Sequence, residues 1–335
     1  MSSKEQGSAA TIYDIAKLAG VNPSTVSRAL STPGRINAKT EAKVKEAAKQ
    51  LNYRVNPFAR ALPTGRTKMI GLMIADITNP VFFSAVRGAE AAAMKYGYTL
   101  VIAESQESTI FEASALEKIE SAVDGMIMVT TRLSDDQLRN LNAKKPIVLM
   151  NRVVKNVEDV VPQNSPGILE AIEHLNSQGH KHIAFLSGPA NSWMSKERWK
   201  HLMKHAIARG MTIVEIGPNP PSLDGGRASL DRLQAAGVTA VVAYNDLMAI
   251  GIMQEAQERG IKVPEKLSII GFDNIFGSDF TSPPLTTIQM PLAEVGQRAV
   301  ESLLQILDEE DVEIRQLEPL QTSLVLRQST AKAKK

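Results

Sequence analysis

Residues 11–30 read TIYDIAKLAGVNPSTVSRAL, and this stretch predicts two short helices. Thr11 can cap the first helix with Asp14 in capping-box position, ahead of an apolar stripe at Ile12, Ile15, Ala16 and Ala19. Gly20 ends this helix, because glycine accepts the left-handed conformation of a C-cap. Asn22 can cap the second helix, and Pro23 fits its first position, where the missing N–H needs no partner.

A third helix is predicted after the break at 32–34, starting at Asn37 and carrying the apolar stripe Val44, Ala47, Ala48 and Leu51. Two short helices joined by about three residues, closed by a third, make a helix-turn-helix unit. The second helix of such a unit enters the major groove of DNA by its N-terminal end. The side chains expected there are Asn22, Pro23, Ser24, Thr25, Ser27 and Arg28. A helical bundle without a partner is the alternative.

This segment resembles the headpiece of the lactose-repressor (LacI/GalR) family. The resemblance is carried by Thr11-Ile12-Tyr13-Asp14-Ile15-Ala16, Ala19-Gly20-Val21 and Ser24-Thr25-Val26-Ser27-Arg28-Ala29-Leu30. It implies that Pro23 and Ser24, the two positions after the turn, contact bases. Proline is a poor hydrogen-bonding residue, so Pro23 is expected to offer apolar contact to a thymine methyl. We expect further DNA contacts from Thr11, Tyr13 and Asn37.

Positive charge is concentrated in the same part of the chain. Residues 1–68 hold 12 Lys and Arg against 4 Asp and Glu, a net charge of +8, and the remainder holds 26 against 32, a net charge of −6. The two sum to the +2 of the whole chain. Such asymmetry is typical of nucleic-acid binding, although a solvated basic arm would show the same charge.

The segment 56–63 has the signals of a miniature helix, with Asn56 as cap, Pro57 at its start and Pro63 at its end. It is too short to be stable alone, so we expect it to fold only on DNA and against a dimer partner. The resemblance implies that paired hinge helices enter the minor groove, with Leu62 as the wedge that bends the duplex. We expect DNA contacts from Asn56, Ala59, Arg60 and Leu62. A plain linker with a buried leucine is the alternative.

From Met69 onward, apolar runs typical of buried strands alternate with helical stretches. The alternation predicts an α/β fold with two doubly wound parallel sheets in series. The predicted organisation is a headpiece at 1–55, a hinge and linker at 56–68, an effector-binding and dimerisation domain at 69–329, and a basic tail at 330–335. The two lobes are expected at about 69–157 plus 288–312 and about 158–287 plus 313–329.

Ligands of open parallel sheets bind beyond the carboxyl ends of the strands. The residues expected there converge on one cleft and are Asp76, Asn79, Phe82, Asn151, Arg152, Arg198, Asn245 and Asp273. Hydrogen-bonding groups around an aromatic ring suit a hydroxyl-rich ligand such as a sugar. The alternatives are that Asn79 and Asn245 only cap helices, that Asp273 is a turn residue, and that Arg198 forms a surface ion pair.

The resemblance extends over essentially the whole chain, through Gly179-His180-Lys181-His182-Ile183-Ala184, Asn245-Asp246-Leu247-Met248-Ala249-Ile250-Gly251, Ser268-Ile269-Ile270-Gly271-Phe272-Asp273-Asn274 and Pro283-Pro284-Leu285-Thr286-Thr287-Ile288. It implies a body similar to periplasmic sugar-binding proteins. The resemblance implies a ninth effector-binding position at Met290, where the family often has a glutamine that reaches the ligand. Pro221 stands near a position that is often aromatic, and Asn151 stands in place of an aspartate. The pentose-type positions Asn79, Phe82 and Arg152 favour ribose or a nucleoside.

The chain contains no cysteine, which excludes disulfides, cysteine-based zinc sites and thiol catalysis. The N-terminus lacks a secretory signal, and no apolar run reaches the roughly 18 residues of a membrane span, so we expect a cytoplasmic protein. There is no phosphate-binding or dinucleotide-binding glycine motif and no catalytic constellation. We therefore predict neither an enzyme nor a cofactor, and His201 and His205 lack the glutamate of a metalloprotease helix.

Together these features predict a sequence-specific transcription regulator, a repressor in function. Its partners are palindromic operator DNA, a small-molecule effector and a second copy of the chain. The alternative is a solute-binding protein of a transporter, which shares the body but has no use for residues 1–62.

Overall fold

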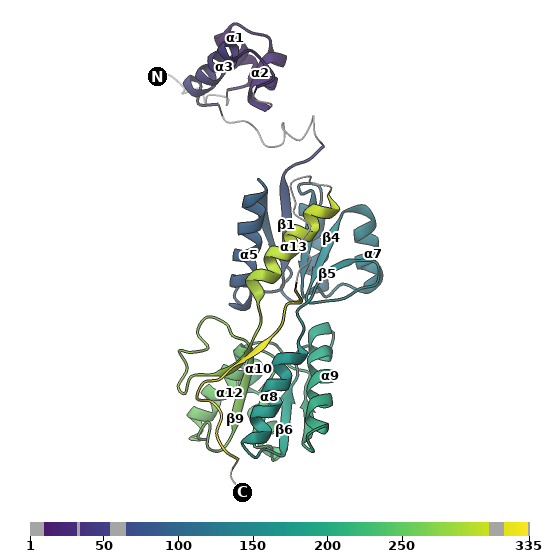
Figure 1. Cartoon of the computed structure of the whole chain (residues 1–335), viewed down its shortest axis with the longest axis vertical. Coiled ribbons are helices and arrows are strands. Elements are labelled where there is room, and N and C mark those ends of the chain that lie inside the picture. Colours follow the sequence, from purple (N-terminus) through teal and green to yellow (C-terminus); the bar gives the residue numbers. More distant parts are fainter. Residues whose placement is uncertain (1–9, 32–33, 54–64, 308–317, 334–335) are drawn as a thin grey trace, which may run out of the picture. The chain divides into compact units, whose positions relative to one another are not determined.

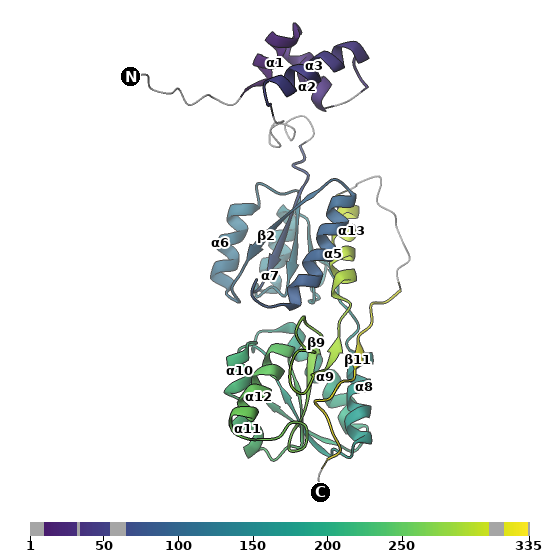
Figure 2. The same cartoon turned by 90° about the vertical axis from the view of Figure 1, so that its left-hand side faces the viewer.

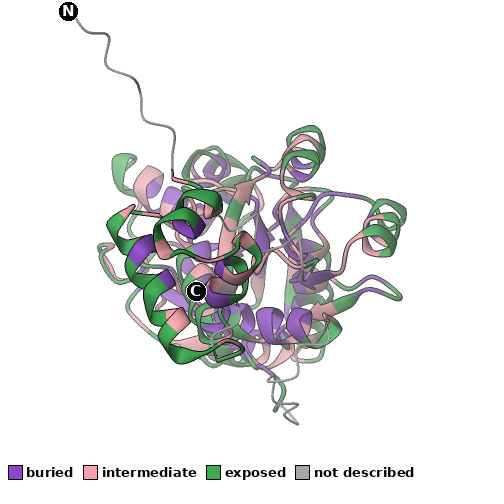
Figure 3. Ribbon diagram, turned by 90° about the horizontal axis from the view of Figure 1, so that it is seen from above, coloured by how far each residue is buried: buried purple, intermediate pink, exposed green. Residues whose placement is uncertain are grey.

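The computed structural model describes residues 10–31, 34–53, 65–307 and 318–333 and divides into two compact units, Met1–Thr67 and Lys68–Lys335 (Figure 1). Each unit has its own apolar core. The helices carry buried residues on one side and exposed residues on the other (Figure 3). The predicted hinge contacts Asn56, Ala59, Arg60 and Leu62 lie outside the described residues.

The first unit is a three-helix bundle of α1 (Ile12–Ala19), α2 (Pro23–Ser31) and α3 (Ala38–Gln50). Thr11 and Asp14 form the predicted capping box, and Gly20 ends α1 with a φ of 66°. Ile15, Val26, Ala29 and Val44 are fully buried in the bundle core. Local capping and the apolar stripe therefore account for the start, the end and the inner face of α1.

The first lobe of the second unit is a parallel five-stranded sheet with helices on both faces. Its strands, in spatial order, are β2 (Thr99–Glu104), β1 (Met69–Ile74), β3 (Gly125–Val129), β4 (Ile147–Met150) and β5 (Glu158–Val160). Its helices are α5 (Val81–Lys95), α6 (Thr109–Ile119), α7 (Asp135–Lys144) and α13 (Leu292–Ile306). Every residue of β3 and β4 is buried, which explains their continuous apolar sequences.

The second lobe repeats this plan in a six-stranded sheet. Its strands, in spatial order, are β11 (Ser323–Val325), β10 (Thr286–Gln289), β9 (Ser268–Asp273), β8 (Ala240–Ala243), β6 (His182–Leu186) and β7 (Thr212–Ile216). Only β11 is antiparallel to its neighbour, β10. The helices of this lobe are α8 (Ser165–Ser177), α9 (Trp193–Ile207), α10 (Leu223–Arg227), α11 (Leu230–Ala235) and α12 (Asp246–Glu258).

The helix α13 comes late in the chain but lies beside α5 in the first lobe (Figure 2). Glycines make this packing close: a Cβ on Gly88 would lie 1.9 Å from the carbonyl oxygen of Ala293, and one on Gly296 would lie 2.1 Å from that of Ala85. The chain therefore crosses between the lobes after β5, again between β10 and α13, and a third time before β11.

The strand pairing shifts two of the expected lobe limits. Glu158–Val160 pairs with β4 in the first lobe, so the first crossing lies beyond the expected position at 157. Ile288 and Gln289 pair with β9 and β11, so they belong to the second sheet rather than to the first lobe. The strands β5, β10 and β11 have three or four residues and include polar ones, so they lack the continuous apolar run that indicates a buried strand.

Within the described residues, no helix has the length and apolar character needed to cross a membrane. The same residues hold no group of three or more histidines and carboxylates arranged to bind a metal ion.

Candidate functional site

The predicted DNA-contacting residues of the first unit lie mostly on its surface. Val26 and Ala29 turn one side of α2 into the core, which leaves the opposite side to solvent. Pro23 and Thr25 are half-buried. The exposed members of the predicted set are Thr11, Tyr13, Asn22, Ser24, Ser27, Arg28 and Asn37. DNA contact itself stays a prediction for all of them.

Thr11 and Asn37 have local hydrogen bonds. The hydroxyl and the backbone N–H of Thr11 both donate to Asp14 Oδ2, at 2.7 and 2.8 Å. These two hydrogen bonds hold the pKa of Asp14 below its usual range. Asn37 caps α3, with its Oδ1 accepting from the Lys39 N–H at 2.9 Å. A helix N-terminus still offers its own backbone N–H groups to a phosphate, so capping does not remove these positions from a DNA-facing surface.

A cavity with about 560 Å³ of space free of atoms lies between the two lobes of the second unit. Seven of the nine predicted effector residues line it: Asn79, Phe82, Asn151, Arg198, Asn245, Asp273 and Met290. The first three come from the first lobe and the next three from the second, whereas Met290 follows β10 at a crossing between the lobes. This size and this mixture of apolar walls with few polar groups are typical of small-molecule sites.

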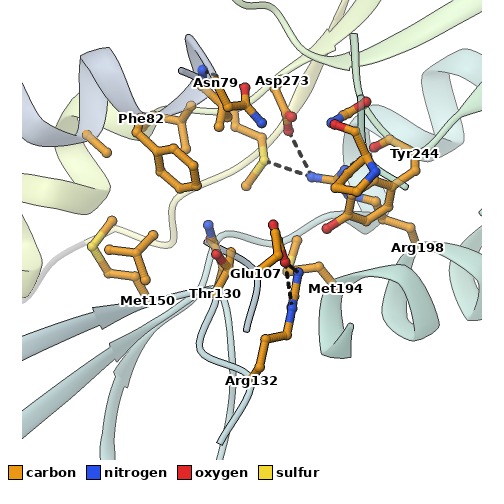
Figure 4. A pocket seen from close by; sticks show the side chains of 18 residues that line it. Asn79, Phe82, Glu107, Thr130, Arg132, Met150, Met194, Arg198, Tyr244 and Asp273 are labelled. Atoms are coloured by element: carbon orange, nitrogen blue, oxygen red, sulfur yellow. Dashed lines mark hydrogen bonds and ion pairs between the residues drawn. The ribbon is translucent and has the colours of Figure 1, made fainter. Parts of the chain in front are cut away.

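Arg198 and Asp273 form a buried ion pair in the cavity wall (Figure 4). Arg198 Nη2 donates to Asp273 Oδ1 at 2.9 Å, and the two side chains are 4% and 7% exposed. The guanidinium carbon also lies 3.6 Å from the ring centre of Phe272 and 4.9 Å from that of Tyr244. The expected alternative of a surface ion pair is therefore wrong for Arg198, because α9 directs it inward.

Burial raises the pKa of Asp273 to about 7, and the nearby Asp246 adds to the rise, while Arg198 opposes it. Burial also raises the pKa of Asp246 to about 6, although Ser278, Thr287 and the Ile275 N–H all donate to its carboxylate. Asp273 itself has a φ of 105°, which L-residues rarely adopt. Arg198 Nε has no hydrogen-bond partner among the described residues.

Asn245 and Asn79 both cap helices and line the cavity. Asn245 Oδ1 accepts from the Met248 N–H at 2.9 Å, and its Nδ2 donates to the Pro221 carbonyl at 3.0 Å. Asn79 Oδ1 accepts from the Val81 N–H at 3.1 Å, which leaves its Nδ2 without a partner among the described residues. Capping and cavity lining are therefore compatible, and only Asn79 keeps its donor for another molecule.

Two predicted residues do not line the cavity. Asp76 Oδ1 accepts from both the N–H and the hydroxyl of Thr78, a local turn that engages one oxygen of the carboxylate. Arg152 donates to the carbonyls of Thr131 and Leu133 and pairs with Asp135, so its guanidinium braces the loop after β3. The residue before it, Asn151, has a φ of 60° and turns the chain at this point.

The cavity also contains polar residues that the sequence reasoning missed, Glu107, Thr130, Arg132 and Tyr244. Glu107 follows β2, and Thr130 and Arg132 follow β3, so the rule about strand ends would have found them had it been applied to these two strands. Arg132 Nε donates to Glu107 Oε2 at 2.8 Å. The first lobe therefore supplies its arginine from the loop after β3 instead of from Arg152.

Two family models match the chain. Residues 11–56 match the model described as bacterial regulatory proteins, lacI family, and residues 172–330 match a periplasmic binding protein-like domain. The first match covers α1 to α3, and the second covers most of the second lobe.

Among curated proteins, the HTH-type transcriptional repressor CytR of Escherichia coli (strain K12) is 33% identical over 316 residues, which cover 91% of this chain and 92% of CytR. The HTH-type transcriptional repressor PurR of Aliivibrio fischeri is 32% identical over 333 residues, covering 96% and 98%. The similarity thus spans both units.

Among solved structures, the lac repressor dimer bound to operator and the anti-inducer ONPF has a TM-score of 0.84 at 27% identity, covering 97% of this chain and all of that one. A LacI family transcriptional regulator from Enterococcus faecium with bound ribose has a TM-score of 0.70 at 28% identity, covering 79% of this chain and all of that one.

Proposed function

The chain belongs to the lacI family of bacterial regulatory proteins, and from this membership we propose that it is a repressor whose operator affinity is set by a small molecule in the interlobe cavity. DNA binding and regulation by a small molecule follow from the family. The choice of contact residues, the class of effector and the pairing of two copies are our proposals. The match of residues 11–56 disfavours a transporter's solute-binding protein, which has no use for that segment.

On the DNA side, the proposal rests on the exposed side of α2. Ser24, Ser27 and Arg28 present hydroxyls and a guanidinium on the exposed side of α2, the helix that is expected to enter a major groove. One headpiece makes few base contacts, so two copies on a palindrome are needed for specificity. The lac repressor, which this chain resembles in structure, forms a dimer on its operator.

On the effector side, the observation that carries the proposal is the Arg198–Asp273 pair in a cavity that both lobes line. A buried ion pair adds little net stability, so stability alone does not explain why it is there. A ligand that touches both lobes favours one relative orientation of them, and this is how binding can reach a distant DNA site. Ribose or a nucleoside is the proposed effector class, and the E. faecium relative binds ribose.

The hinge remains a prediction from sequence. Residues 56–62, which would convert lobe movement into loss of DNA affinity, lie outside the described residues.

The test has two stages. In the first stage, DNA duplexes with a randomised central sequence are enriched by repeated selection for binding to the full chain. A mobility-shift titration then measures the affinity of the chain for the enriched sequence. We expect enrichment of a two-fold symmetric site. A pool that stays random after repeated selection refutes the DNA-binding half of the proposal.

In the second stage, sugars and nucleosides are screened by thermal shift, because a ligand that binds only the folded state raises its stability. Each ligand that raises the melting temperature is then added to the mobility shift. We expect Asp273→Ala to lose the effect of the ligand on DNA binding while keeping operator affinity without ligand. A full ligand response in Asp273→Ala removes Asp273 from the site.

A further inference from the structure

Asp246 is a buried carboxylate that the effector proposal has not used. It is the first residue of α12 and follows Asn245, which lines the cavity. Its side chain is fully buried, and both of its carboxylate oxygens are engaged. Oδ2 accepts from the Ile275 N–H at 2.8 Å and from the Ser278 hydroxyl at 2.6 Å. Oδ1 accepts from the Thr287 hydroxyl at 2.5 Å. One carboxylate therefore joins α12, the turn after β9 and the strand β10.

The turn after β9 starts with two residues in an unusual backbone conformation. Asp273 has a φ of 105° and Asn274 a φ of 54°, in the left-handed region that L-residues rarely adopt. Such conformations cost free energy and persist only where the surrounding structure holds them. The Asn274 N–H donates to Thr287 Oγ1 at 3.3 Å, and the next N–H along the chain is the one that donates to Asp246. The network around Asp246 therefore holds the backbone directly after the strained pair.

This turn bears on the direction of the Asp273 side chain. Asp273 is the last residue of β9, so the position of its carboxylate depends on the turn that follows. Figure 4 shows this carboxylate beside the Arg198 guanidinium, with which it forms the ion pair of the cavity wall. The contacts of Asp246 thus lie within a few residues of a group that faces the cavity.

A role in stability alone does not account for the contacts of Asp246. An aspartate in the first turn of a helix is favoured by the helix dipole and needs no contact with another loop. Asp246 instead extends over β9, where glycine leaves room for it: a Cβ on Gly271 would lie 2.0 Å from Asp246 Oδ1. A buried carboxylate costs free energy even when it is hydrogen-bonded, and burial raises the pKa of Asp246 to about 6. Three donors from the turn and from β10 nevertheless converge on it.

We propose that Asp246 is a positioning residue of the effector site: its carboxylate holds the turn after β9 and so directs the Asp273 carboxylate at Arg198. The inference rests on the proposed function, in which Asp273 faces the effector. Asp246 is not among the residues that line the cavity, so it acts through Asp273 and does not touch the effector itself.

The first measurement is hydrogen exchange of the full chain without ligand. Asp246→Asn replaces one acceptor by an NH₂ group that faces donors, so at least one of the three hydrogen bonds is lost. The amides of Asn274 and Ile275 should then exchange about 10- to 100-fold faster, the value of a hydrogen bond to a charged group. Unchanged exchange at these two amides overturns the inference.

The second measurement separates positioning from stability and also needs no ligand. Arg198 Nε has no hydrogen-bond partner among the described residues, so its N–H signal in a chain with ¹⁵N-labelled arginine reports on the ion pair beside it. The signal is identified by its loss in Arg198→Lys. Thr287→Val removes the hydroxyl that joins Asp246 to Asn274 and keeps every charge. It should move the Arg198 signal toward its position in Asp273→Asn, whereas Thr287→Ser keeps the hydroxyl and should keep the wild-type signal. A wild-type signal in Thr287→Val overturns the inference.

Ser268→Ala is the matched control for the loss of a buried hydroxyl. Ser268 lies at the other end of β9, where its hydroxyl bonds to the backbone of Ala331. This variant should match the wild type in both measurements. Thermal unfolding of all variants shows that they are folded.

The third measurement connects the turn to the effector. Isothermal titration with D-ribose, adenosine and cytidine samples the proposed effector class. A probe that binds the wild type should bind Asp246→Asn about 10- to 100-fold more weakly. Full affinity in this variant overturns the inference while the proposed function stands. If none of the three probes binds the wild type, the proposed effector class is wrong, and the two measurements without ligand still decide the inference.

Discussion

The buried carboxyl of Asp273 makes the stability of the second unit depend on pH, and Asp273→Asn should remove the contribution of this group to that dependence. The folded-state pKa of about 7 lies above the ordinary aspartate value of 3.8, because burial disfavours the charged form. Between these two values the folded state binds more protons than the unfolded state. Stability therefore falls as pH rises through this range.

The size of the effect follows from the two pKa values. At pH 5 the group is almost fully protonated in the folded state and ionised in the unfolded state, whereas at pH 8 it is ionised in both. The contribution of Asp273 to the free energy of unfolding should therefore fall by about 2–3 kcal/mol from pH 5 to pH 8. Asparagine does not titrate, and its Oδ1 can still accept from Arg198, so the variant should lose the part of the slope that comes from Asp273 and keep the fold.

The assay is urea unfolding of both proteins at pH 5, 6, 7 and 8 without ligand. The two tryptophans of the chain, Trp193 and Trp199, are both on α9, the helix that carries Arg198, so their fluorescence reports on the lobe that holds the pair. The quantity to compare is the unfolding free energy of Asp273→Asn minus that of the wild type, which should rise by about 2–3 kcal/mol with pH. Asp246, whose pKa burial raises to about 6, contributes a slope of its own to both proteins.

A difference that stays constant within about 0.5 kcal/mol across this pH range refutes the reasoning, because roughly 1.4 kcal/mol is expected per unit of pKa shift. Asp279→Asn removes one exposed aspartate from the same lobe and controls for the general loss of a negative charge.

Three further predictions concern other parts of the chain. Arg28→Ala should weaken operator binding by about 1–3 kcal/mol if Arg28 contacts a base edge; a mobility shift at fixed salt measures this, and unchanged affinity would remove Arg28 from the interface. Thr11→Ala should destabilise the first unit by about 1 kcal/mol through loss of the capping box, measured by thermal unfolding of the headpiece helices, and an equal melting temperature would contradict it. Gly88→Ala should cost about 1–3 kcal/mol or more in urea unfolding, because the new Cβ would lie 1.9 Å from the Ala293 carbonyl oxygen; a neutral result would show that α5 and α13 can separate freely.

Much of the fold was predictable because its elements are encoded locally. The strands β3, β4 and β8 coincide with apolar runs of the sequence, since every residue in them is buried. Residues 223–235 form two helices, α10 and α11, rather than one, because the Ser229 hydroxyl bonds to the Gly225 carbonyl and Gly225 and Gly226 pack against neighbouring backbone. The short strands β5, β10 and β11 were missed.

The candidate site was predictable to a lesser degree. The rule that ligands bind at strand ends placed Asn79, Asn245 and Asp273 in one cavity from sequence alone. The same rule cannot distinguish Arg152 from Arg132, since both follow buried strands of the first sheet. The conformation of the loops determines which arginine lines the cavity. Arg152 donates to the carbonyls of the loop after β3, whereas Arg132 donates to Glu107 in the cavity.

The sequence by itself determined the helix-turn-helix, because its cap at Thr11, its glycine stop and its apolar stripe act within a few residues of one another. It also determined the two doubly wound sheets, since buried parallel strands must be continuously apolar. Only the tertiary structure decided which charged groups meet. Arg198 and Asp273 are 75 residues apart, and Glu107 and Arg132 are 25 apart. The packing of the lobes and the conformation of the loops bring these partners together. Because the partners are far apart in the sequence, no local sequence pattern predicts the pairs.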